Sequence, residues 1–226
     1  MRTPVKVAIV ATSLIVVALL IALIASIVQR NASEAPAPAG ASPTGTTPPS
    51  AQRENSHVLD DGSDGSVTVV EFLDFECEAC GAFYPIVEDL RSTYKGKITY
   101  VVRYFPLPGH LNSTNAAVAA EAAARQGRFE EMYRKLFETQ TAWAEAKEPR
   151  TDVFRGYAQE LGLDMAAYDR DVADPATLAR VQQDVTDGRA LGVNSTPTFF
   201  VDDAPLTLKR IGDLGDAIDA AVRGRG

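Results

Sequence analysis

The chain contains few of the residues that build metal centres and disulfide frameworks. Its 226 residues include two cysteines, two histidines and one tryptophan. A structural zinc site takes about four ligands, so all four of these cysteines and histidines would be needed, and they form no second closely spaced pair. A fold with one cysteine pair does not depend on several disulfides. We therefore predict no metal and no cofactor, with zinc as a minor alternative.

Basic residues are scarce beyond the first 30 positions. All 30 acidic residues follow position 30, together with 19 of the 22 basic ones, so this part of the chain carries a formal charge of −11. Nucleic acids and anionic lipid head groups attract positive charge. The composition argues against both as partners, and we expect no nucleic-acid binding.

Charge is absent from residues 7–28, which are 22 predominantly apolar positions. At about 1.5 Å per residue, such a helix spans the ~30 Å hydrocarbon core of a bilayer. Arg2 and Lys6 precede the segment and only Arg30 follows closely, which favours a cytoplasmic N-terminus. We predict a transmembrane anchor over residues 1–30, with a cleaved signal peptide as the alternative, and an extracytoplasmic position for everything that follows.

Residues 31–55 are rich in Ala, Pro, Ser, Thr and Gly and lack the apolar residues that build a core. This segment is predicted to be a semi-extended linker that holds the domain off the membrane. Residues 56–226 have the length of one domain.

The two cysteines form a Cys77-Glu78-Ala79-Cys80 motif directly after an apolar run, residues 67–75. A disulfide within this motif closes a very small loop, and such a loop stabilises the fold little. A Cys-x-x-Cys motif between a strand and a helix is typical of a disulfide that opens and closes. We therefore predict a redox-active pair, in preference to an inert tight disulfide.

The pattern of apolar residues predicts the order of the elements. A strand over residues 67–75, a helix over 77–94 and a strand over 98–105 form a βαβ unit with parallel strands. Helices follow over residues 114–125, 129–137, 151–161 and from Asp164, and a further one begins at Asp174-Pro175. Strands over 198–201 and 206–211 form a hairpin, and Asp213 is expected to cap a last helix.

The chain resembles the thioredoxin superfamily, and specifically its DsbA-like branch. The resemblance lies in the strand Val69–Phe72, the segment Phe75–Cys80, the block from Ala116 to Phe137 and the segment Val193–Phe199, which occur in the family's order. It implies an α/β fold, the thioredoxin fold with an inserted helical domain at about residues 112–192. The transmembrane helix predicted from the apolar run precedes this fold. It also implies thiol–disulfide oxidoreductase activity.

Cys77 is expected to lie exposed at the start of a helix, where unpaired N–H groups and the helix dipole favour a thiolate. We assign it as the attacking cysteine and the more buried Cys80 as the resolving cysteine. The resemblance implies a cis peptide bond between Thr196 and Pro197, with the Thr196 backbone available to a client strand. It also favours a role for Glu71 as a buried acid that exchanges a proton with Cys80, over an ordinary outward-facing carboxylate.

The motif departs from the better-known DsbA pattern, which has proline and histidine between the cysteines. Here Glu78 and Ala79 occupy these positions, and Glu76 flanks the motif. A carboxylate about 7 Å away opposes a thiolate by about 0.6–2.4 kcal/mol, which offsets a helix N-terminus effect of about 0.3–2 kcal/mol. We therefore expect the pKa of Cys77 to be less depressed than in a strongly oxidising relative. His110 is expected to be a surface or capping histidine without a catalytic role.

The expected function is that of a membrane-tethered bacterial oxidase, which introduces disulfides into reduced or misoxidised exported proteins. The resemblance implies a membrane quinone-linked thiol oxidase as the partner that reoxidises it. The alternatives are a reductase or isomerase of exported proteins, and a non-catalytic, chaperone-like binding module.

Overall fold

The computed structural model describes residues 50–63 and 66–225. The predicted transmembrane anchor, residues 1–30, and most of the predicted linker lie outside these residues. Among the described residues, no helix is both long and apolar enough to cross a membrane.

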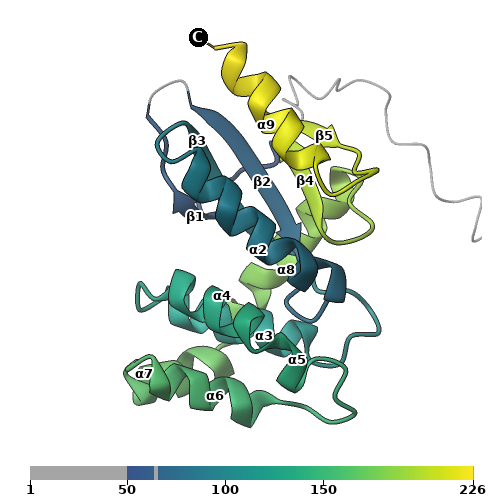
Figure 1. Ribbon diagram of the computed structural model, residues 1–226. Helices are drawn as coiled ribbons and strands as arrows, with labels where there is room; N and C mark the ends of the chain where they lie inside the picture. The colour runs from purple at the N-terminus through teal and green to yellow at the C-terminus, as the bar shows by residue number, and fades with distance from the viewer. Residues whose placement is uncertain (1–49, 64–65, 226) are drawn as a thin grey trace, which may run out of the picture. The chain divides into compact units, whose positions relative to one another are not determined.

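The described residues contain a five-stranded sheet in the order β1-β3-β2-β4-β5, which lies in the upper half of Figure 1. The parallel pair β2 (Val67–Leu73) and β3 (Ile98–Tyr104) confirms the predicted βαβ unit. Strand β4 (Thr198–Val201) runs antiparallel to β2, and β5 (Ala204–Leu206) completes the hairpin. The edge strand β1 (His57–Asp60) pairs antiparallel with β3 and was not predicted.

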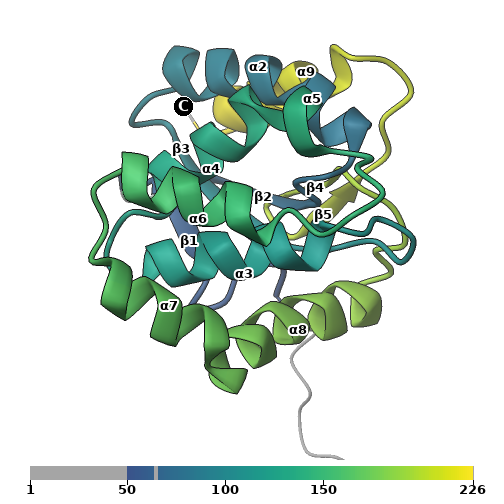
Figure 2. The same ribbon diagram turned by 90° about the horizontal axis from the view of Figure 1, so that it is seen from below.

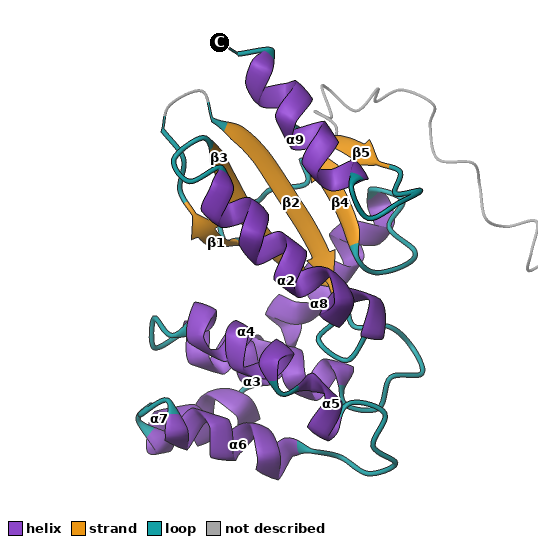
Figure 3. Ribbon diagram, viewed as in Figure 1, coloured by secondary structure: helices purple, strands orange, loops and turns teal. Residues whose placement is uncertain are grey.

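Because side chains alternate along β2, this strand contributes residues to two separate cores, one on each face of the sheet. Val69 and Leu73 face the core that contains Val87 of α2 (Glu78–Thr93) and Ile218 of α9 (Asp213–Arg223). Val70 and Phe72 of the same strand face the opposite core, which Val185 of α8 (Pro175–Ala190) covers. Figure 3 shows α2 and α9 on one face of the sheet and α8 behind it. Glu71 is two positions after Val69 and therefore faces the same side of the sheet, so it lies under α2.

The predicted helical insertion is present between β3 and β4. Figure 2 shows α3 with α4, α5 and α6 on one side of it and with α7 and α8 on the other. The insertion begins with α3 (Ser113–Ala124), α4 (Phe129–Glu138) and α5 (Gln140–Trp143), and it ends with α6 (Thr151–Glu160), α7 (Met165–Ala173) and α8. Asp164 and Asp174 cap α7 and α8 as expected, because each carboxylate accepts a backbone N–H of the first turn.

The end of the predicted linker belongs to the folded unit, so the boundary at residue 56 is too late. Ala51 is fully buried, its N–H donates to Asp203 at 2.8 Å, and its carbonyl accepts from Arg103 at 2.9 Å. Arg53 forms an ion pair with Asp187 of α8. Residues 50–55 are therefore packed onto the domain rather than extended away from it.

The predicted strand over residues 206–211 is also wrong beyond Leu206. Asp213 does not cap α9 from its N-cap position, which Gly212 occupies. Its carboxylate instead accepts the backbone N–H groups of Lys209 and Arg210, at 2.6 and 2.9 Å. This turn takes the chain out of the sheet before the final helix.

Candidate active site

The fold brings the two sequence segments with the strongest functional signal into contact. Cys77 is the N-cap residue of α2, and residues 74–76 connect it to the end of β2. Pairing of β4 with β2 places Thr198 opposite Phe72, so the preceding Thr196–Pro197 segment lies beside the cysteines. The Thr196–Pro197 peptide bond is cis, as expected. The Cys77 thiol donates to the Thr196 carbonyl oxygen at 3.5 Å.

Both cysteines are free thiols in this structure. Cys77 is 8% exposed and Cys80 is 1% exposed, so the prediction that Cys77 is exposed is wrong, although the order of burial is as predicted. The Cys77 sulfur contacts the Thr196 carbonyl, although the two residues lie 119 positions apart.

The two thiols have opposite pKa shifts. The pKa of Cys77 is lowered to about 5, chiefly by a hydrogen bond from the Cys80 thiol; burial opposes this, and the Thr196 side chain and the N–H groups of Ala79 and Cys80 lower it further. The pKa of Cys80 is raised well above 9, chiefly by burial. At neutral pH the reduced site therefore carries its negative charge on Cys77.

The carboxylates that flank the cysteines do not act as the sequence suggested. Glu78 and Ala79 are exposed, whereas Glu76 is buried and turns into the protein. The two oxygens of Glu76 accept the backbone N–H groups of Asn112 at 2.6 Å and Glu145 at 3.1 Å. Neither carboxylate is among the main causes of the shift at Cys77. The prediction of a weakened pKa depression is wrong in its premise, because Glu76 links the active-site loop to the helical insertion.

Asp74 is a site residue that sequence reasoning missed. Its buried carboxylate accepts the Glu76 N–H at 2.9 Å, the Leu107 N–H at 3.0 Å and the Ser113 hydroxyl. It also bonds to His110 Nδ1 at 2.7 Å. Although burial opposes the charge of His110, this bond raises its pKa, and the negative charge of Cys77 contributes in the same direction. His110 is therefore more than the surface histidine we expected, because it joins the network that surrounds the cysteines.

Glu71 lies in the core beneath the cysteine pair and is 2% exposed. Burial raises its pKa to about 7, even though the Tyr100 hydroxyl donates to its carboxylate at 2.6 Å. The charges of Glu71 and Cys80 act on each other, because the Glu71 carboxylate also raises the pKa of Cys80. The outward-facing alternative is thus contradicted, and an acid that titrates near neutral pH lies within electrostatic reach of both thiols.

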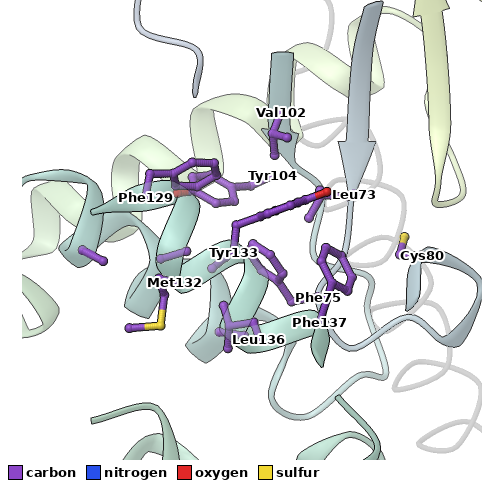
Figure 4. Close-up of a cluster of buried hydrophobic side chains, with 14 of the residues drawn as sticks. Leu73, Phe75, Cys80, Val102, Tyr104, Phe129, Met132, Tyr133, Leu136 and Phe137 are labelled. Carbon is purple, nitrogen blue, oxygen red and sulfur yellow. The ribbon is translucent and has the colours of Figure 1, made fainter. Parts of the chain in front are cut away.

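An aromatic cluster from the insertion packs beneath the active-site loop. Phe75 contacts the rings of Tyr133 and Phe137, with centroids 6.2 and 5.2 Å away. Figure 4 shows these rings beside Leu73, with Cys80 at the margin of the cluster. The apolar stripe that was predicted in α4 is buried as expected, and it belongs to the same buried core as Cys80.

The low pKa of Cys77 can be measured by alkylation. In the reduced protein, the rate of reaction of Cys77 with iodoacetamide is expected to be half-maximal near pH 5, because only the thiolate reacts. Cys80 does not interfere, since its pKa is raised well above 9. The denatured protein is the control, with a midpoint near the ~8.5 of a free cysteine. A native midpoint equal to that of the denatured chain would contradict this assignment.

Comparisons with known proteins agree with this arrangement. A family model described as thioredoxin matches residues 61–220. Among curated proteins, the chain is 39% identical over 153 residues to the Na⁺/H⁺ antiporter NhaA 1 of Mycobacterium sp. strain KMS, which covers 66% of the chain and 24% of the antiporter. It is 42% identical over 136 residues to the Na⁺/H⁺ antiporter NhaA 3 of Salinispora tropica, covering 60% and 20% respectively. The chain thus spans about a quarter or less of these relatives.

Solved structures match a larger share of the fold. A thioredoxin-like oxidoreductase from Silicibacter pomeroyi DSS-3 is 32% identical, with a TM-score of 0.64 over 79% of this chain and 99% of the other. BdbD from Bacillus subtilis is 21% identical, with a TM-score of 0.65 over 75% and 94%. MdbA, a thiol-disulfide oxidoreductase from Corynebacterium diphtheriae, is 19% identical, with a TM-score of 0.60 over 74% and 89%. At these lower identities, the last two matches concern the fold alone.

Proposed function

The chain belongs to the thioredoxin family, and from this premise we propose that it is a thiol–disulfide oxidoreductase that oxidises exported proteins through Cys77 and Cys80. The observation that carries the proposal is the difference between the two thiols. Cys77 has a pKa of about 5 and keeps some exposure, whereas Cys80 is buried with a pKa well above 9. This difference suits disulfide exchange, in which Cys77 acts as nucleophile and leaving group while the partner Cys80 is protected.

The low pKa also favours oxidation of clients over their reduction. A stabilised Cys77 thiolate stabilises the reduced form of the pair, and a pair whose reduced form is stabilised passes its disulfide on readily. A hydrogen bond from the Cys80 thiol provides most of this stabilisation, and the Thr196 side chain and the N–H groups at the start of α2 add to it. A reductase would need the opposite balance, in which the disulfide form is the more stable one.

The reaction follows from this geometry. A client thiolate attacks Cys77 Sγ of the Cys77–Cys80 disulfide; the S–S bond breaks, and Cys80 leaves as a thiolate and takes up a proton. A second client thiolate then attacks the client sulfur of the mixed disulfide and expels Cys77 as a thiolate. The client gains a disulfide, and the two electrons of its thiols reside on Cys77 and Cys80. In this proposal the Thr196 backbone, which lies beside Cys77, pairs with the client as an added strand.

Glu71 is the proposed proton donor to the departing Cys80. With a pKa of about 7, it is partly protonated at neutral pH, which is the condition for efficient proton transfer in either direction. In the reverse reaction, the same carboxylate takes the proton from Cys80 as that thiol attacks. Because Glu71 is buried in the core, water does not take its place as the proton donor.

The cellular setting remains the one that the sequence suggests. We propose that residues 1–30 anchor the chain in the membrane, with the described domain on the outer side, where reduced exported proteins pass. A membrane quinone-linked thiol oxidase is the proposed partner that restores the Cys77–Cys80 disulfide. A reductase or isomerase, and a non-catalytic binding module, are the alternatives.

The direction of electron flow is tested in living cells. Rapid acid quench followed by thiol labelling should find Cys77 and Cys80 mostly as a disulfide, because an oxidase is kept oxidised by its partner. A mostly reduced pair would instead support the reductase alternative.

A second test captures the clients. In a Cys80→Ser variant, the resolving thiol is lost, so mixed disulfides between Cys77 and exported proteins should accumulate and appear as reducible adducts on gels. A Cys77→Ser/Cys80→Ser variant is the matched control and should form none. Equal adduct levels in both variants, or none in either, would count against the proposed enzyme.

A further inference from the structure

Gln140 of the helical insertion contacts the backbone on both sides of Glu76. Its Nε2 atom donates to the carbonyl oxygens of Phe75 and Cys77, each at 2.8 Å. Because both partners are acceptors, the amide nitrogen rather than the amide oxygen must face them. The side chain is buried. One residue from another part of the chain therefore holds the Phe75–Glu76 peptide group and the Cys77–Glu78 peptide group, the second of which begins at the reactive cysteine.

These peptide groups determine the backbone conformation of Cys77 where it joins the start of α2. As the N-cap, Cys77 has an extended backbone with φ −68° and ψ 122°, and no side chain caps the helix through an ordinary hydrogen bond. This conformation allows the sulfur to face the N–H groups of Ala79 and Cys80. The Cys77 carbonyl also accepts the Gly81 N–H at 3.0 Å, so Gln140 occupies its second acceptor site. Rotation of Cys77 away from the helix would break both bonds.

Gly81 provides the space that Gln140 needs. A Cβ atom at position 81 would lie 1.9 Å from Gln140 Oε1 and 2.7 Å from its Cδ. Position 81 is in the first turn of α2 and has no left-handed φ, so its backbone conformation does not require glycine. Glycine is among the least favourable residues in a helix. The close approach of Gln140 is thus the structural reason for glycine at this position.

We propose that Gln140 is a positioning residue for the redox site, which holds Cys77 in the conformation where the backbone N–H groups of α2 stabilise its thiolate. In this arrangement the helical insertion, and not the thioredoxin fold alone, sets the reactivity of the attacking cysteine. The inference rests on the proposed function for its role in disulfide exchange, while the contact itself is testable on the isolated thiol.

Two variants remove the contact from opposite sides. Gln140→Met keeps the length of the side chain and removes its donors, whereas Gly81→Ala keeps every hydrogen-bonding group and displaces Gln140. Each is expected to raise the alkylation midpoint of Cys77 by about one pH unit, a roughly tenfold lower thiolate-to-thiol ratio at a given pH. Because both changes remove the same contact, the double variant should shift the midpoint no further than either single one.

Two matched controls separate positioning from general effects on the fold. Gln126 also forms two hydrogen bonds to backbone, with Asp164 at 3.1 and 2.9 Å. A Cβ atom at Gly156 of α6 would meet nothing within 4 Å. Gln126→Met and Gly156→Ala should therefore leave the midpoint of Cys77 unchanged, whatever they do to the melting temperature.

An unchanged midpoint in either variant, Gln140→Met or Gly81→Ala, that keeps a native circular dichroism spectrum overturns the proposal. If neither variant folds, the contact serves stability and the positioning role is likewise overturned. Oxidation of a reduced client peptide by the parent protein is measured in parallel. Shifted midpoints without client oxidation refute the proposed function alone, and client oxidation without shifted midpoints refutes this inference alone.

Discussion

A Cys77→Ser variant is expected to oxidise reduced client proteins no faster than the uncatalysed exchange, while it folds at least as well as the parent. Cys77 occupies the N-cap of α2 without a side-chain capping bond, and serine is a favoured N-cap residue whose hydroxyl can accept an N–H of the first turn. Loss of activity in this variant therefore reports on chemistry rather than on unfolding. The measurement is the rate of disulfide formation in a reduced client, with the melting temperature as the check on folding.

Cys80 cannot replace the missing nucleophile. Its side chain is 1% exposed and its pKa is raised well above 9, so it presents almost no thiolate to a client at neutral pH. The same variant also tests the binding-module alternative. A chaperone-like module should protect unfolded clients from aggregation equally well with serine at position 77, and an unchanged oxidation rate would refute a catalytic role for Cys77.

Most of the fold could be predicted because its local patterns agree with its tertiary structure. The apolar run of β2 and the 3.6-residue spacing in α4 are each buried as their periodicity indicates. Strand β1 was missed because only Val58 and Leu59 are apolar there, and its extended form depends on pairing with β3. The strand after Leu206 was wrong for a similar reason, since the carboxylate of Asp213 diverts the backbone.

The site residues likewise differ in whether their roles could be predicted from local sequence. The Cys-x-x-Cys motif and the Thr196–Pro197 dipeptide are recognisable because their residue types and order carry the chemistry. Asp74 and Gln140 were missed because their roles exist only through partners distant in sequence, such as the Leu107 N–H and the Cys77 carbonyl. Sequence also does not show which way a charged side chain points. Glu76 was therefore assigned an electrostatic effect, although its carboxylate is held by two backbone N–H groups.

The second large effect is a loss of stability, and it is expected in the core on the face of the sheet that α8 covers. Arg103 of β3 and Asp184 of α8 are both fully buried and form an ion pair, with Arg103 Nε donating to Asp184 at 2.8 Å. The other carboxylate oxygen accepts the Tyr104 N–H at 3.1 Å. Asp187 and the Ala51 carbonyl bind the rest of the guanidinium. The network connects α8, the helix that leads to Thr196–Pro197, with the central sheet and residues 50–55.

An Asp184→Ala variant is expected to lose about 3 kcal/mol of unfolding free energy, because it leaves a buried guanidinium short of one counter-charge and the Tyr104 N–H without its acceptor. For a domain of this size, the melting temperature should fall by roughly 6–12 °C. Asp169→Ala is the control, since its ion pair with Arg155 is about half exposed and such pairs contribute about 0–1 kcal/mol. A combined Arg103→Met/Asp184→Leu variant should recover part of the loss, because it removes the stranded Arg103 charge. Arg180, which also pairs with Asp184 at 2.7 Å, and the Tyr104 N–H still lack their partner in that variant. If the double variant instead melts below Asp184→Ala, the network itself, and not the stranded charge, is what stabilises the packing of α8 on the sheet.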